Sequence, residues 1–308
     1  IVKACHGDRS KQALGKTQKI DEGVAGRVVA ERKPILVTDI RRDNRFNRSE
    51  RPDYKTKSFV SAPLIVEERV LGVINVIDKA SGDSFCETDV NLLCTIAGQV
   101  SIAVENARLY EALEENCFNM VTALAKSLEA KDKYTSGHSQ RVAEYSSVMA
   151  RTMGVSDKDM TTLRHAALLH DIGKIGISEF IINKTDKLND TEFATIKSHP
   201  CQGEQIIKPL TFLDDAIHHI RSHHESFDGR GYPDRLGGDD LSLLTRIMTV
   251  ADAFDAMTSD RTYRSSMKTN KAVSELRRVA GKQFDPEVVD AFASSEIVKM
   301  KSDLESNY

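Results

Sequence analysis

The sequence predicts an α+β chain: an N-terminal α/β domain with an antiparallel sheet, a long connecting helix and a C-terminal all-α helical bundle. Three observations support this fold class. Before residue 78, short β-rich runs alternate with turns. From Val90 to Lys131 apolar residues recur at helical spacing, with no proline and with Gly98 as the only glycine. From Cys117 onward helical patterns dominate and strand-like stretches are scarce.

Length and charge limit the class of protein. The 308 residues are enough for two domains of ordinary size. The formal net charge is −3 and no basic stripe is present, so nucleic acid is not an expected partner. The sequence has no signal-peptide pattern and no apolar run of about 18 residues, which predicts no membrane segment in this fragment.

The first residues and the cysteines predict whether the chain is a fragment and in which redox compartment the protein lies. The chain begins Ile1-Val2-Lys3 without methionine, which indicates an internal fragment of a longer protein. The five cysteines are odd in number and form no C-x-x-C pair, so we expect reduced thiols in a cytoplasmic protein.

The first domain is predicted from its hydrophobic runs. A short helix is expected at residues 23–30 and a short strand at residues 34–37. Residues 61–66 and 70–77 flank a short polar link, which is the pattern of an antiparallel hairpin.

Residues 1–108 resemble a GAF domain. The resemblance implies a sensor fold that lacks its usual first helix and is therefore incomplete at its N-terminal end. GAF domains hold cyclic nucleotides, haem, bilins, metals or nothing, so a ligand-binding sensor and a ligand-free dimerisation module are both open. Cys5, His6 and Cys86 lack ligand spacing, and we assign no metal or haem site to them. The matching motifs are Gly23-Val24-Ala25-Gly26, Ile35-Leu36-Val37-Thr38-Asp39, Pro63-Leu64, Leu71-Gly72-Val73-Ile74-Asn75 and Ile102-Ala103-Val104-Glu105-Asn106.

Residues 109–131 are predicted to form a helical connector. A helical pattern longer than about 25 residues favours a coiled coil or a rigid linker, and the alternative is two helices that break near residues 114–116. We expect the connector to transmit changes from the first domain to the second. Because its apolar stripe leaves one face uncovered, we also expect a parallel homodimer through the connector and the GAF helices. The stripe includes Leu109, Leu113, Val121, Leu124 and Leu128.

The second domain is predicted to consist of helices. Thr135 or Ser136 is the expected N-cap of a helix that has His138 in its first turn. Another helix is expected to begin at Ser156 and to carry His170. Further helices are expected at residues 191–198, 202–207, 214–224, 241–259 and 270–280.

Five histidines and two aspartates form the candidate site. Such side chains need partners when they are buried. One or two helices' worth of chain separates each group from the next, which is how a helical fold brings ligands to a shared metal site. The seven residues are His138, His170, Asp171, His199, His223, His224 and Asp252.

Residues from about 118 to 295 resemble the HD-GYP branch of the HD-domain metal phosphohydrolases, and we expect this domain to span residues 118–308. The resemblance implies an all-helical domain that cleaves cyclic di-GMP. His165, His218 and His219 match no ligand position of the family, and we expect them on helix surfaces. The motifs, in family order, are Gly137-His138-Ser139, Leu168-Leu169-His170-Asp171-Ile172-Gly173-Lys174, Lys197-x-His199-Pro200, His223-His224-Glu225-x-x-Asp228-Gly229-x-Gly231-Tyr232-Pro233, Val250-Ala251-Asp252, Arg261-x-Tyr263-Arg264 and Gln283-Phe284-Asp285-Pro286.

Phosphodiester hydrolysis needs a strong nucleophile and neutralisation of phosphoryl charge, and two metal ions with a bridging hydroxide can supply both. Asp171 is the expected bridge because a carboxylate offers two oxygens. Imidazole-rich sites suit Fe, Mn, Co or Zn, and the resemblance favours Fe or Mn. With Asp171, we assign one ion to His138, His170 and Asp252, and the other to His199, His223 and His224.

The family resemblance also bears on the number of ions. Some members hold a third ion through a glutamate four residues before the histidine of the Gly-His motif, where this chain has Tyr134. A phenol is a poor anionic ligand at neutral pH. We therefore expect two ions, with Tyr134 lining the substrate pocket. Glu129 and Asp132 are the nearby carboxylates that could substitute, and Asp132 is favoured.

Further residues are candidates for substrate contact. Lys174 follows Asp171 by three residues and is expected to stabilise developing phosphoryl charge. Gly231 and Tyr232 are expected in a loop that contacts the sugar-phosphate or a guanine, and the alternative is that this loop only shapes the wall of the site.

Arg261 and Arg264 are candidate phosphate clamps, because guanidinium groups match phosphate oxygens. Glu225 and Asp255 are expected to orient ligand side chains. The expected function is GAF-regulated hydrolysis of cyclic di-GMP to pGpG or GMP. The alternatives are hydrolysis of a hybrid cyclic dinucleotide, and a catalytically idle adaptor that binds partner signalling proteins.

Overall fold

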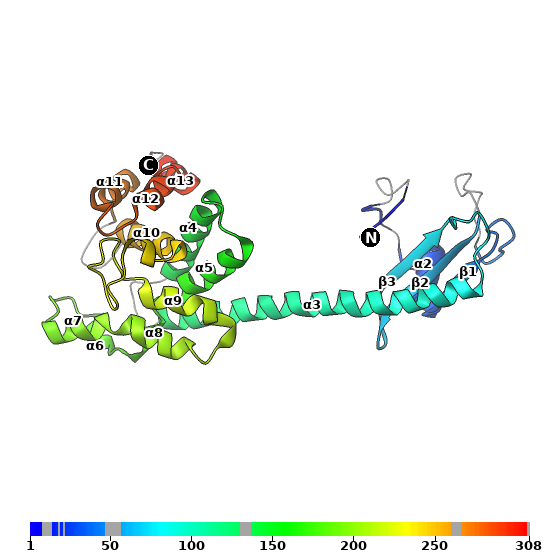
Figure 1. Cartoon of the computed structure of the whole chain (residues 1–308), viewed down its shortest axis with the longest axis horizontal. Coiled ribbons are helices and arrows are strands. Elements are labelled where there is room, and N and C mark those ends of the chain that lie inside the picture. Colours follow the sequence, from blue (N-terminus) through cyan, green and yellow to red (C-terminus); the bar gives the residue numbers. More distant parts are fainter. Residues whose placement is uncertain are drawn as a thin grey trace. The chain divides into compact units, whose positions relative to one another are not determined.

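The computed structural model describes residues 1–7, 14–17, 19–20, 22–46, 57–129, 137–259 and 266–306, with side chains up to residue 301. The chain divides into two compact units, Ile1–Glu114 and Glu115–Tyr308 (Figure 1). Within the described ranges, none of the helices combines the length and apolar character needed to span a bilayer.

The first unit is built on a three-stranded antiparallel sheet. Helix α2 (Gly23–Glu31) precedes strands β1 (Ile35–Val37), β2 (Phe59–Val66) and β3 (Arg69–Ile77), which pair in the order β1-β2-β3. The predicted hairpin is confirmed: β2 and β3 pair antiparallel, and Glu67 in the link has a φ of 54°.

Both faces of this sheet are covered. Because side chains alternate along a strand, Phe59 and Val60 point to opposite faces. Phe59 belongs to a buried cluster with Val24 and Val28 of α2. Val60 belongs to a second cluster, with Leu93 and other residues at the start of helix α3 (Glu87–Glu129).

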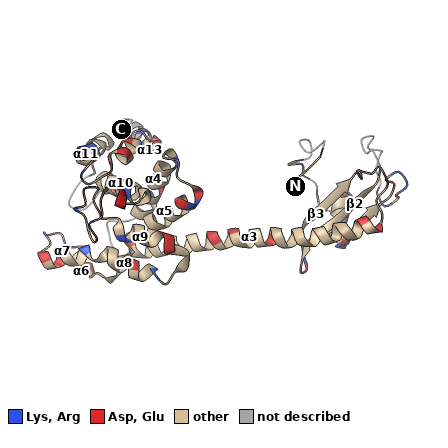
Figure 2. Ribbon diagram, viewed as in Figure 1, with Lys and Arg blue, Asp and Glu red and all other residues tan. Residues whose placement is uncertain are grey.

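Helix α3 is continuous over 43 residues, so the alternative of a break at residues 114–116 is wrong. Glu87 and Asp89 lie in its first turn and Lys126 in its last, which suits the helix dipole. The helix is mostly tan in Figure 2, with scattered acidic residues. Within the first unit, α3 exposes large apolar side chains, namely Leu92, Ile96, Ile102, Val104, Leu109, Tyr110 and Leu113.

The second unit is helical. Its core packs fully buried side chains such as Met149, Leu163 and Phe254. All the predicted helices are present with slightly shifted bounds, whereas α6, α12 and α13 are not predicted by the sequence patterns. The elements are α4 (His138–Thr152), α5 (Asp157–Leu169), η1 (Ile172–Gly176), α6 (Glu179–Ile182), α7 (Asp190–Lys197), α8 (His199–Ile207), η2 (Thr211–Leu213), α9 (Asp214–Ser222), η3 (Gly238–Asp240), α10 (Leu243–Thr258), α11 (Thr269–Val279), α12 (Pro286–Ala293) and α13 (Glu296–Ser306).

Local signals explain several helix starts. Ser156 accepts a hydrogen bond from the backbone N–H of Asp159 and caps α5, so this helix begins within one residue of its predicted start. Asp285 caps α12, whose first residue is Pro286. Helix α4 has Gly137 as its N-cap residue. The predicted caps Thr135 and Ser136 lie outside the described residues.

Candidate metal centre

The seven candidate ligands come from five helices of the second unit, and six of them lie at or just beyond helix ends. His138 is the first residue of α4 and His199 the first of α8. His170 ends α5, and Asp171 stands between it and η1. His223 and His224 follow α9, and Asp252 lies within α10. The helices therefore bring residues from distant parts of the sequence to one interior point.

The ligand atoms form two groups, and Asp171, a member of one, also faces His199 of the other. His138, His170 and Asp171 have ligand atoms within 4.8 Å of one another, and so do His199, His223 and His224. Asp171 Oδ1 lies 3.2 Å from His199 Nε2, and Asp171 Oδ2 lies 3.5 Å from His170 Nε2. Each carboxylate oxygen thus faces a different group, which is the arrangement of a bridging ligand.

Three of the histidines are oriented by backbone carbonyls. Nδ1 lies 2.8 Å from Ala167 O in His170, 2.7 Å from Ile196 O in His199 and 2.6 Å from Ile220 O in His223. In each case the carbonyl lies three residues earlier, in the last turn of a helix, where carbonyls lack an intrahelical partner. Because a carbonyl only accepts hydrogen bonds, Nδ1 carries the proton and Nε2 is left with a lone pair.

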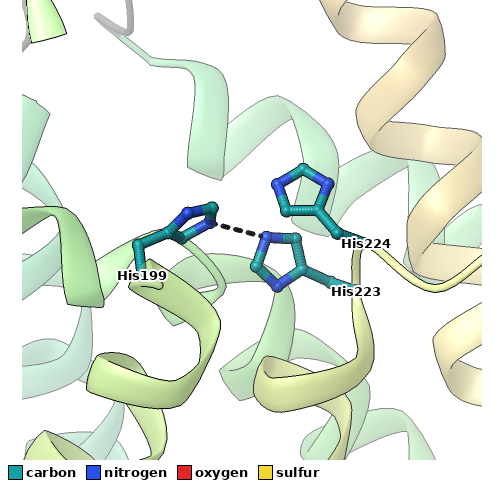
Figure 3. Close-up of side chains that lie close together, drawn as sticks. All are labelled: His199, His223 and His224. Atoms are coloured by element: carbon teal, nitrogen blue, oxygen red, sulfur yellow. Dashed lines mark hydrogen bonds between the residues drawn. The ribbon is translucent and has the colours of Figure 1, made fainter. Parts of the chain in front are cut away.

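Figure 3 shows the consequence of this orientation. His199 Nε2 and His223 Nε2 face each other at 3.1 Å, and the ring of His224 lies beside them. Two neutral imidazoles of this tautomer would direct lone pairs at one another, which is unfavourable without a cation between them. The donor set therefore fits a transition-metal ion, for which neutral imidazole is a common ligand.

His138 is held differently, between two carboxylates. Its Nδ1 lies 2.8 Å from Asp255 Oδ2 and its Nε2 lies 3.2 Å from Asp252 Oδ1. Arg141 Nε donates to Asp255 Oδ1 at 2.6 Å, and Asp255 is fully buried. Asp255 thus occupies the place of a partner that orients a metal-binding imidazole. Burial lowers the pKa of His138, but hydrogen bonds with Asp252 and Asp255 raise it more, to about 10.

The shifted pKa values of Asp171, His223 and His224 favour binding of a divalent cation. Burial raises the pKa of Asp171, but Lys174 and neighbouring histidines lower it more, so it lies well below its usual range. Burial lowers the pKa of His224 to about 4. Burial and the nearby histidines hold the pKa of His223 well below 6.5. Metal ligands must be deprotonated, and these groups meet that condition near neutral pH, whereas His138 would have to release its proton.

Lys174 lies against the shared carboxylate. Its Nζ donates to Asp171 Oδ2 at 2.6 Å. The expected proximity is present, but through the 3₁₀ turn η1 rather than an extended α-helix. Gly173 allows this turn to pack on α8, because a Cβ there would lie 1.9 Å from the carbonyl oxygen of His199.

The loop after α9 forms one wall of the centre. The Tyr232 ring stacks on the His224 ring with a centroid distance of 4.9 Å. Lys197 Nζ lies 5.0 Å from the centroid of the same tyrosine ring. A Cβ at Gly231 would lie 2.4 Å from Glu225 Cα, so this glycine is required by packing.

Glu225 makes bonds other than the expected ones. Its Oε1 accepts from the backbone N–H groups of Asp234 and Arg235, at 2.6 Å and 2.9 Å. These bonds close the loop after α9 and do not orient a ligand side chain.

Two further predictions about side chains are wrong. His165 and His219 are buried rather than on helix surfaces, and only His218 of these three is exposed. His219 Nδ1 lies 2.8 Å from Thr245 Oγ1 and is a hydrogen-bonded core residue. Among the expected substrate contacts, Tyr134, Arg261 and Arg264 lie outside the described residues.

Sequence reasoning also missed several contributors. Arg141 has no role in the sequence-based prediction, although its spacing of three residues from His138 is a signal for a shared helix face. Lys197 precedes His199 by two residues. The carbonyls that orient the histidines carry no sequence signal beyond their position three residues earlier.

Comparisons with known proteins identify the families of both parts of the chain. A family model described as HD domain matches residues 122–288, and one described as GAF domain matches residues 3–105. The 3'3'-cGAMP-specific phosphodiesterase 3 of Vibrio cholerae is 44% identical over 168 residues, which cover 54% of this chain and 36% of that protein. A cyclic di-GMP phosphodiesterase of Thermotoga maritima is 37% identical over 187 residues, which cover 59% of this chain and 50% of that protein.

A solved structure of a cyclic GMP-AMP specific phosphodiesterase of V. cholerae is 39% identical, with a TM-score of 0.37, and the match covers 56% of this chain and 39% of that one. The chain spans between about a third and a half of the length of these curated relatives.

Proposed function

The chain belongs to the HD domain family, and from this premise we propose that it is a metal-dependent phosphodiesterase that hydrolyses a cyclic dinucleotide. The observation that carries the proposal is the set of imidazole nitrogens converging around Asp171. The Nε2 atoms of His199 and His223 face each other at 3.1 Å, with their Nδ1 atoms engaged by carbonyls. Two imidazole lone pairs that face each other are unfavourable in a protein core without a cation and favourable in a metal-binding site.

We assign the ligands of two ions as the sequence predicts, with iron or manganese favoured. His138, His170 and Asp252 would hold one ion, His199, His223 and His224 the other, and Asp171 would serve both. Two such ions, when bound, supply an activated water and neutralise charge on the phosphoryl oxygens.

The chain's own residues would orient the substrate. Lys174 sits 2.6 Å from Asp171 Oδ2 and presents a positive charge where a scissile phosphate would approach. The ring of Tyr232 is held against His224 and offers an apolar surface to a sugar or base. Arg261 and Arg264 remain proposed phosphate contacts, and Tyr134 a proposed pocket residue.

The leading substrate is cyclic di-GMP, with pGpG or GMP as product. The relatives also support a second candidate, 3'3'-cGAMP, because proteins named as specific for that compound are 44% and 31% identical to this chain. Both are cyclic dinucleotides with two phosphodiester bonds, so the same centre can serve either.

We assign regulation to the GAF domain and a homodimer to the exposed face of α3. In the first unit, Leu92, Ile96, Ile102, Leu109 and Leu113 leave apolar surface uncovered on this helix. A second copy of the helix would bury the stripe, and Ile102, Leu109 and Leu113, spaced by seven and then four residues, match the heptad repeat of a coiled coil.

A direct comparison of substrates tests the proposal. The purified protein, loaded with Mn²⁺ or Fe²⁺, is incubated in parallel with cyclic di-GMP and 3'3'-cGAMP, and products are separated by chromatography. The proposal expects hydrolysis of at least one compound and its loss on chelation. Metal binding without hydrolysis of either compound would favour the adaptor, and absence of metal binding would refute the centre itself.

A further inference from the structure

The N-terminus of α4, which carries His138, receives its cap from another helix. Its N-cap residue is Gly137, which has a φ of 70° and no side chain to accept a hydrogen bond. Glu129, the last residue of α3, supplies the acceptors instead. Its Oε2 accepts from Gly137 N at 2.7 Å, and its Oε1 accepts from Ser139 N at 3.0 Å.

These two bonds flank the candidate ligand on both sides. The backbone of His138 lies between the two amides held by Glu129, and its ring is held by Asp255 and Asp252. A carboxylate at a helix N-terminus also interacts favourably with the helix dipole, and charge-assisted bonds to amides are stronger than neutral ones. Glu129 therefore fixes the backbone position of His138 and is not itself a ligand.

We propose that Glu129 is a positioning residue for His138, and that through it the end of α3 sets the metal affinity of the centre. This inference rests on the proposed function, because it takes His138 as a metal ligand. The final residue of α3 contacts α4 on each side of His138, so a displacement or rotation of that end would move the ligand's backbone.

A second cap in the same unit provides the control. Glu192 accepts from Asn189 N at 2.8 Å in the capping box of α7. No candidate ligand lies on α7. Replacing Glu192 by alanine removes a carboxylate cap in the first turn of α7, together with its ion pair to Lys184, whereas the Ile196 carbonyl that orients His199 lies in the last turn of that helix.

The test measures Mn²⁺ binding by calorimetry in the parent chain, Glu129→Ala, Glu129→Gln and Glu192→Ala. Residues that orient metal ligands typically contribute about 10- to 100-fold to affinity. We expect Glu129→Ala to bind Mn²⁺ weaker by that factor, and Glu192→Ala to stay within about twofold of the parent. Glu129→Gln should be intermediate, because an NH₂ donor replaces one of the two oxygens that face the amides of Gly137 and Ser139, and NH₂ cannot accept from an amide.

Unfolding curves of the four proteins separate positioning from stability. If Glu129→Ala and Glu192→Ala lose similar stability and only Glu129→Ala loses Mn²⁺ affinity, the inference holds. Parent-like affinity in folded Glu129→Ala, or an equal loss in Glu192→Ala, overturns it. A parent chain that binds no Mn²⁺ overturns the proposed function, and this inference with it.

Discussion

Replacing Asp171 with asparagine is expected to abolish hydrolysis and leave the fold in place. The buried carboxylate directs Oδ1 to His199 and Oδ2 to both His170 and Lys174. Asparagine has nearly the same shape, but one of its two terminal atoms becomes an NH₂ donor. It therefore cannot face both groups of ligands with an anionic oxygen.

The expected losses of turnover and of stability in Asp171→Asn differ in size. A metal ion stabilises transition-state charge by several kcal/mol, and about 1.36 kcal/mol corresponds to tenfold in rate. Loss of one ion should lower kcat by about three orders of magnitude or more. The fold loses mainly the charged bond to Lys174, and such a bond contributes about 1.5–3 kcal/mol.

The assay compares the parent with Asp171→Asn and with Asp239→Asn, which changes an exposed aspartate. Metal per chain is measured by elemental analysis, stability by thermal unfolding, and turnover by product chromatography. We expect fewer than two ions per chain and no measurable turnover in Asp171→Asn, whereas Asp239→Asn should behave like the parent. Two tightly bound ions together with parent-like turnover in this variant would refute the bridging role.

Three further predictions concern orientation, pH and assembly. Asp255→Asn should weaken Mn²⁺ binding about 10- to 100-fold in calorimetry, because it removes the anionic partner of His138. Burial lowers the pKa of His219 to about 4, below the ordinary 6.5. Between pH 4 and 6.5 the unfolded chain therefore binds more protons than the folded chain at this residue. The free energy of unfolding should fall by about 2 to 3 kcal/mol from pH 7 to pH 4.5 for this reason. In urea unfolding, His219→Gln should lose this contribution to the pH dependence of stability. The parent should be a dimer by light scattering, and a Leu109→Glu, Leu113→Glu double variant a monomer.

Each of these predictions has a result that contradicts it. Asp285→Asn removes another buried aspartate, which pairs with Arg246, and it is the control for Asp255. An equal loss of affinity in both variants would indicate general destabilisation. A His219→Gln curve with the same pH dependence as the parent would show that His219 is not the group responsible. A monomeric parent at micromolar concentration would refute the dimer.

The sequence by itself determined most of the secondary structure and the composition of the candidate site, but not helices α6, α12 and α13. Helices and hairpins depend on local patterns, so the run after Val90 predicts α3, and residues 61–77 predict the β2–β3 hairpin. The seven candidate ligands were also identified from the sequence, because charged and imidazole side chains at the ends of apolar helices need a shared partner.

Only the tertiary structure decided how these residues face one another. His138 and Asp255 are 117 residues apart, and their contact depends on the packing of α4 against α10. Packing elsewhere in the second unit directs the two oxygens of Asp171 to different groups, brings Glu129 to the start of α4 and buries His219. Local periodicity specifies the face of one helix and not the partner that covers it, so contacts of this kind follow from the fold alone.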